Sequence, residues 1–117
     1  MVKSREELQI FLENILGSRH VYFQPPESVK MEYPAIVYSK SNLRNTFANN
    51  SVYAQDIAYE IIVIDKNPDS EIVRKLSITP YCRFDRQYKS ENLNHDVFTI
   101  FIKGGRLNVK NAMGSGR

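Results

Sequence analysis

The chain contains a single cysteine, Cys82, among its 117 residues. One cysteine cannot form a disulfide within the chain, and it cannot supply the set of thiolates that a structural zinc site uses. A composition without disulfides fits a reducing compartment. We interpret Cys82 as a small buried residue of a strand, because a free cysteine packs well among apolar side chains.

Long apolar runs are missing as well. The longest purely aliphatic run, residues 61–64, is far shorter than the roughly 20 residues that cross a bilayer as a helix. The first seven residues also lack the apolar core of a signal peptide. We therefore expect a protein that is made in the cytoplasm and has no membrane partner.

Glycine is scarce, with five residues at positions 17, 104, 105, 114 and 116. None of them stands between a predicted strand and a predicted helix, where a phosphate-binding loop needs its glycines. This absence argues against a nucleotide-binding enzyme, and we expect no cofactor.

Histidine is also scarce, since His20 and His95 are the only two. The tripeptide Asn94-His95-Asp96 has side chains that occur in catalytic sites, but no serine or cysteine stands beside it in a nucleophile motif. Asparagine and aspartate in turns hydrogen-bond their own backbone, so we interpret this tripeptide as part of a turn.

Three acids, Asp56, Glu60 and Asp65, lie close together in the sequence and are followed by Lys66. Metal-dependent nucleases can hold Mg²⁺ with carboxylates placed on strands. On a strand, however, Asp56 and Glu60 share one face and Asp65 lies on the other. A polar stretch at the end of a strand explains these residues better, so we expect neither a metal site nor an enzyme.

Acids are absent from the last 15 residues, 103–117, which nevertheless contain four basic residues. The whole chain has a net charge of +3, so the first 102 residues sum to −1. A body that bound nucleic acid through its surface would usually be more basic. We expect a single domain over residues 1–103 and a basic, flexible extension over 104–117. The candidate residues for contact with an acidic partner surface or with DNA are Lys103, Arg106, Lys110 and Arg117.

The sequence does contain one clear helix signal near its start. Ser4 and Glu7 have the spacing of a capping box, and apolar residues follow at helical spacing from Leu8 to Ile15. Gly17 is a typical residue after a helix. We predict a helix over residues 5–16 with one apolar face.

The strongest strand signal is unusually long. Residues 52–64 alternate in the manner of a strand, and at 3.3 Å per residue they would span about 43 Å, compared with roughly 17–20 Å for a typical strand. A domain of this size cannot cover such a strand completely. We therefore expect part of it to project and to pair with a partner.

The remaining pattern predicts an α+β fold with helices packed on an antiparallel-rich mixed sheet. The expected order is α-β-β-β-α-β-β, with a long hairpin between the second and third strands. A second helix is expected from a cap at Asp69 or Ser70 to Ser77, and a polar turn over residues 89–96. The expected strands are 21–23, 35–39, 52–64, 81–88 and 97–102.

Residues 40–51 have no acid, are rich in asparagine and serine, and are expected to form the tip of the long hairpin. Leu43 and Phe47 are apolar residues in this polar segment. They either fold back onto the domain or contact a neighbouring subunit. The candidate interface residues are Leu43, Arg44, Phe47 and Tyr53.

The element order, together with three stretches of sequence, resembles the tail terminator proteins of long-tailed bacteriophages and prophages, also called tail completion or tail-to-head joining proteins. The resemblance covers residues 5–102, and none of the stretches is a catalytic motif. The stretches are VYFQPPESVKMEYPAIVYS at 21–39, VIDKNPDSEI at 63–72 and FDRQYKSENLNHDVFTIFI at 84–102.

This resemblance implies a structural virion protein of the neck or tail. Such a protein forms a ring, usually a hexamer, that caps the tail tube, ends its polymerisation and joins it to the head connector. The implied partners are further copies of the chain, the tail tube protein, the connector or stopper protein, and the genomic DNA in the channel. An alternative is a small nucleic-acid-binding protein that uses the basic extension and residues 40–51.

Overall fold

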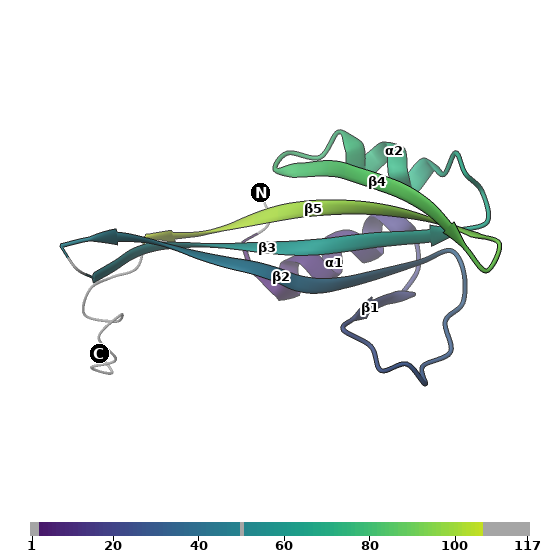
Figure 1. Ribbon diagram of the computed structural model, residues 1–117, viewed down its shortest axis with the longest axis horizontal. Helices are drawn as coiled ribbons and strands as arrows, with labels where there is room; N and C mark the ends of the chain where they lie inside the picture. The colour runs from purple at the N-terminus through teal and green to yellow at the C-terminus, as the bar shows by residue number, and fades with distance from the viewer. Residues whose placement is uncertain (1–2, 50, 107–117) are drawn as a thin grey trace.

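The computed structural model describes residues 3–49 and 51–106, and the side chains of all of these except 51–53 and 103–106. Two helices and five strands follow the order that the sequence predicts (Figure 1). The helices are α1 (Arg5–Leu16) and α2 (Glu71–Ser77). The strands are β1 (Val21–Phe23), β2 (Ala35–Ala48), β3 (Ser51–Asp65), β4 (Cys82–Ser90) and β5 (Leu93–Arg106).

The five strands form one sheet in the spatial order β1-β2-β3-β5-β4. The order in space therefore differs from the order along the chain, because β5 lies between β3 and β4. Only the β1–β2 pair is parallel, and the other three pairs are antiparallel. The predicted mixed, mostly antiparallel α+β fold with a long β2–β3 hairpin is confirmed.

Helix α1 begins and ends where the sequence predicts. The Ser4 hydroxyl accepts a hydrogen bond from the backbone N–H of Glu7, and the Gly17 N–H donates to the carbonyl of Glu13. Gly17 has φ of 81°, the left-handed conformation that glycine adopts at little cost. The Glu7 carboxylate accepts from the Lys3 N–H, one residue earlier than in the usual capping box.

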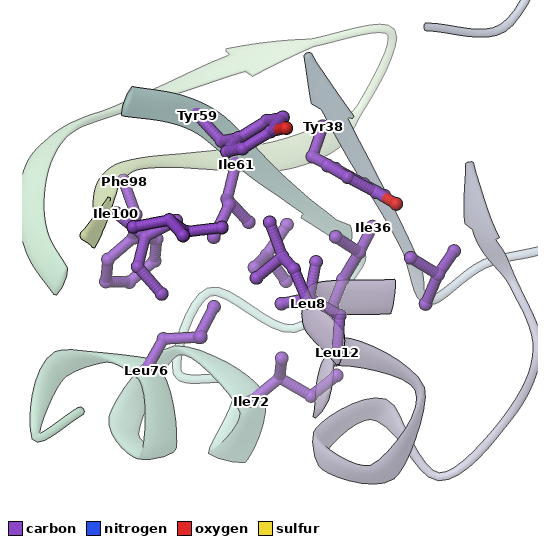
Figure 2. Packing of buried hydrophobic residues seen from close by; sticks show 13 residues of the cluster. Leu8, Leu12, Ile36, Tyr38, Tyr59, Ile61, Ile72, Leu76, Phe98 and Ile100 are labelled. Atoms are coloured by element: carbon purple, nitrogen blue, oxygen red, sulfur yellow. The ribbon is translucent and has the colours of Figure 1, made fainter. Parts of the chain in front are cut away.

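Both helices pack on the same face of the sheet and enclose one hydrophobic core. Figure 2 shows Leu8 and Leu12 of α1, and Ile72 and Leu76 of α2, directed at the strands. The strand residues that share this core are Val21, Ile36, Tyr38, Tyr59, Ile61, Val63, Phe98, Ile100 and Ile102. The expected apolar face of the first helix is therefore confirmed as core packing.

An aromatic group extends this core toward β1. The rings of Phe23, Tyr38 and Tyr59 lie within 6.3 Å of one another, centroid to centroid, at tilted or edge-on angles. The Arg5 guanidinium lies 4.5 Å from the centre of the Phe23 ring. Burial raises the pKa of the Tyr38 phenol, which donates a hydrogen bond to Gln9. The start of α1 is thereby fixed to the middle of the sheet.

The predicted bounds of β2 and β5 are wrong. The second strand was expected to end at residue 39, but β2 continues to Ala48, so residues 40–48 are strand and not a loop. The last strand was expected over 97–102, but β5 begins at Leu93 and continues through both glycines to Arg106. In each case the polar or glycine-containing part of the strand pairs with β3, and this pairing satisfies its backbone.

The turn predicted over residues 89–96 is also wrong, because the observed turn is much shorter. Only Glu91 and Asn92 separate β4 from β5, with φ of 53° and 65°, as in a tight hairpin turn. His95 and Asp96 lie on β5 itself. The His95 ring stacks on Tyr88 at 4.7 Å, and these cross-strand contacts accommodate polar residues that the sequence pattern assigns to a turn.

Candidate subunit interface

The most distinctive feature of the molecule is an arm that extends beyond the core. We define the arm as residues 40–56 of the β2–β3 hairpin and residues 103–106 of β5. Every described β2 side chain from 40 to 48 is exposed to solvent. Figure 1 shows the hairpin tip projecting away from both helices. The radius of gyration is 16.4 Å, compared with about 13 Å for a compact domain of this length.

Both outer edges of the arm lack a neighbouring strand among the described residues. Strand β1 pairs with residues 36–38 of β2, and β4 pairs with residues 93–100 of β5. Neither β1 nor β4 therefore reaches the arm. An open strand edge is a template for pairing with another chain. Register shifts interrupt the β2–β3 ladder near Ser41 and near Phe47, and such irregularities reduce uncontrolled edge pairing.

Leu43 and Phe47, the two large apolar residues of β2 in the arm, do not fold back onto the domain. Leu43 is 44% exposed and Phe47 is 65% exposed. The core contains neither of them. Of the two possibilities that the sequence left open, the structure excludes folding back and leaves these side chains available to a partner.

Polar contacts between β2 and β3 hold the arm in register. The Arg44 guanidinium donates to the Asp56 carboxylate at 3.1 Å, and the Gln55 amide donates to Asn45 at 3.0 Å. The Ser41 hydroxyl donates to the Ala58 carbonyl at 3.2 Å. The Arg44–Asp56 and Gln55–Asn45 contacts are exposed. Exposed ion pairs contribute roughly 0–1 kcal/mol each, so the backbone ladder carries most of the arm's stability.

The remaining predicted interface residues fall partly outside what the structure describes. Tyr53 lies on β3, and Lys103 and Arg106 lie on β5, but only their backbone is described. Lys110 and Arg117 lie outside the described residues.

A shallow hollow lies at the base of the arm, and no pattern in the sequence indicates it. The part of the hollow that Tyr81 lines has a volume of about 270 Å³. This is slightly below the roughly 300–1,000 Å³ of small-molecule pockets. The lining residues are Asn42, Arg44, Asp56, Ala58, Tyr81 and Phe101.

Tyr81 lines this hollow and has a left-handed backbone conformation. Its φ is 64°, a conformation that costs most residues about 1–2 kcal/mol, and its side chain is 51% exposed. Its carbonyl accepts a hydrogen bond from the Phe101 N–H at 2.9 Å, which holds it beside β5. Strained residues of this type occur often at functional sites. Only the fold brings Tyr81 and Phe101 together, so no local sequence pattern could have identified them.

The residues considered for catalysis or metal binding are dispersed. Within residues 3–49 and 51–106, no three His, Cys, Asp or Glu side chains lie close enough together to hold a metal ion. Asp56 pairs with Arg44, whereas the Asp65 carboxylate accepts from the N–H of Asn67. Asp56 and Asp65 therefore make separate local contacts in different parts of β3.

Cys82 is partly buried at the start of β4 and packs against the core. Burial, together with the nearby Asp85 charge, raises the pKa of its thiol to about 12. The thiolate is the nucleophilic form of cysteine, so a thiol with this pKa is almost entirely unreactive near neutral pH. This environment agrees with the interpretation of Cys82 as a packing residue.

Comparison with known proteins gives no family assignment. No protein-family model matches the chain, and no curated protein matches its sequence. Neither helix in the described part of the chain is long and apolar enough to span a membrane.

Proposed function

We propose that this protein is a structural subunit of a bacteriophage neck or tail. Several copies, six in the arrangement typical of tail terminators, form a ring that caps the tail tube and ends its polymerisation. The ring joins the tube to the head connector and leaves a channel for the genomic DNA. The virion is then the protein's final location, after synthesis in the bacterial cytoplasm.

The observation that carries this proposal is the arm. The arm exposes Leu43 and Phe47, and no described strand covers either of its edges. These features do not stabilise a monomer, but they are well suited to contact between subunits. A contact between two different surfaces of identical chains closes into a ring when the rotation between them allows it. The three stretches that resemble tail terminator proteins support the same function.

The ring hypothesis is tested by measuring native mass across a wide concentration range. Multi-angle light scattering should show a closed oligomer, and negative-stain images should show rings with a central opening. Where free subunits stay apart, added tail tubes should nucleate the ring at one end of each tube. A protein that remains monomeric both in solution and on tubes contradicts the proposal.

The alternative, a small nucleic-acid-binding protein, is favoured by the basic residues of the arm and the C-terminal segment. It predicts a monomer that binds DNA with an affinity that falls steeply as salt increases. A fluorescence anisotropy titration with a short duplex, performed beside the mass measurement, separates the two functions. Tight DNA binding by a monomer would favour the alternative.

A further inference from the structure

The two ends of the long axis carry opposite formal charge. The arm contains four basic residues and one acid, which gives +3. These residues are Lys40, Arg44, Lys103, Arg106 and, as the single acid, Asp56. We define the far end as residues 17–20, 24–34, 65–71 and 89–92. It contains six acids and four basic residues, which gives −2.

The strand register brings the four segments to the end of the sheet opposite the arm, where the 24–34 connection arrives after starting beside Tyr38 and Lys40. Val21 lies beside Ile36, and Ala35 lies beside Ile64, so the connections before β1 and β2 meet the end of β3. Asp65 lies beside Asn94, which brings the β4–β5 turn to the same end. Figure 1 shows these connections at the end of the sheet away from the hairpin tip. The described residues between the two ends sum to zero.

The far end also carries exposed aromatic side chains. Tyr33 lies in the far end, Tyr88 directly precedes its last segment, and both side chains are exposed. Tyrosine is enriched in protein interfaces. The arm carries the exposed Leu43 and Phe47 among its basic residues. Each end therefore offers apolar side chains together with a charge that is opposite to that of the other end.

We propose that the arm of one copy docks on the far end of the next copy. The occupant of the arm's exposed surface is thus a second copy of this chain, oriented head to tail. This inference rests on the proposed ring function and specifies which surfaces meet. Charge complementarity steers such contacts and fixes their orientation, whereas like charges placed together oppose them. The same complementarity disfavours arm-to-arm pairing through the open strand edges.

Two charge reversals test the proposal. The arm variant combines Lys40→Glu with Arg44→Glu, and the far-end variant combines Asp69→Lys with Glu91→Lys. These four residues are exposed. Arg44→Glu also removes the ion pair with Asp56, but a single ion pair of an exposed side chain stabilises little, so the monomer should fold in each variant. A matched control, Lys3→Glu with Lys75→Glu, makes the same change in net charge as the arm variant, at positions outside both ends. Circular dichroism and thermal unfolding establish that every variant is folded.

We expect each end variant alone to assemble at least about tenfold more weakly than the wild type, because like charges then face each other. The control should assemble normally. An equimolar mixture of the two end variants should recover assembly, because each reversed end then meets a complementary partner. Raising the salt concentration should weaken wild-type assembly, since ions screen charges separated by more than about 10 Å at 0.1 M.

The possible results separate this inference from the function on which it rests. If wild-type protein forms rings and both end variants do so equally well, the head-to-tail assignment is wrong and the ring function stands. If the variants fail to assemble both alone and when mixed, these two surfaces do not meet. A wild-type protein that never assembles, in solution or on tubes, overturns both.

Discussion

At the scale of single residues, Asp96 is the most unusual group in the described part of the chain. Its side chain is buried, and one carboxyl oxygen accepts from the Gln87 amide at 2.9 Å. The other oxygen, Oδ2, has no hydrogen-bond partner within residues 3–49 and 51–106. Burial raises the pKa of Asp96, and the nearby Asp65 charge adds to this effect, despite the opposing contribution of the Gln87 hydrogen bond.

This environment predicts a specific pH dependence of stability. A carboxyl group with a raised pKa in the folded state favours folding below its unfolded pKa of about 3.9. That contribution is lost as the pH rises through the higher folded pKa. The Asp96→Asn variant cannot ionise, so its stability relative to the wild type should increase between acidic and neutral pH. Urea unfolding at several pH values measures the difference.

Asp85 supplies a control of opposite sign for this experiment. Burial alone would raise its pKa, but hydrogen bonds from Thr99 and Arg83 lower it below the ordinary value. Its contribution to stability should therefore be lost as the pH falls, and Asp85→Asn should become relatively more stable in acid. If Asp96→Asn follows the same direction as Asp85→Asn, the interpretation of Asp96 is incorrect.

At the scale of elements, the arm is a strand ribbon made largely of polar residues. Residues 44–56 can be replaced by Asn-Gly, a favoured two-residue hairpin turn, because Leu43 and Ile57 lie opposite each other in the ladder. The shortened protein keeps Ile57, which packs against the core. Most of the lost side chains that the structure describes are exposed, so the free energy of unfolding should change by about 1 kcal/mol or less. Assembly should be lost.

Leu12→Ala provides the contrasting variant. It removes a fully buried side chain from the core and should lower the free energy of unfolding by about 2–5 kcal/mol, with the arm intact. Chemical unfolding and light scattering on both proteins separate stability from assembly. An arm-shortened protein that assembles as well as the wild type would exclude the arm as the subunit interface.

The elements that the sequence predicts well are those whose signals are local. The Ser4 cap, the apolar spacing of α1 and the Ser70 cap of α2 depend on residues within a few positions of one another. The outer part of β2 has no alternating apolar pattern, because neither of its faces is buried. It is a strand because β3 satisfies its backbone, and this long-range cause is absent from the local pattern.

The candidate site shows the same division. Leu43 and Phe47 could be selected from the sequence because they are apolar residues within a polar segment. Tyr81 and Phe101 could not be selected, because they are separated by 20 positions and meet only through the pairing of β5 with the end of the α2–β4 connection. Their role at the arm-base hollow depends on the spatial order of the strands.

At the scale of the whole molecule, the protein is elongated, with extents of 51 × 28 × 22 Å. The last described residue, Arg106, lies beside Ala54 on the arm. The basic Lys110 and Arg117 follow it in the sequence. Any contact that these residues make with an acidic partner would therefore start from the arm and not from the core.

Truncation after Arg106 tests the role of this segment. The truncated protein should keep its fold and its thermal stability, because the described strands are complete. It should bind the tail tube or connector more weakly at low salt, and the difference should shrink at high salt because ions screen exposed charges. Sedimentation of ring–tube complexes at two salt concentrations measures this. Equal binding by the two proteins would leave the basic segment without a docking role.

The arm also has a mechanical consequence. The arm resembles a beam that is fixed at one end. The core and the helices hold its base, and its hairpin tip is free. A load on the tip of such a beam produces its largest bending moment at the root, where the β2–β3 ladder changes register beside Ser41. An irregular ladder is more compliant than a regular one, so deflection would concentrate there. Copies in one assembly could then adjust their tips to uneven neighbours while their cores stay the same.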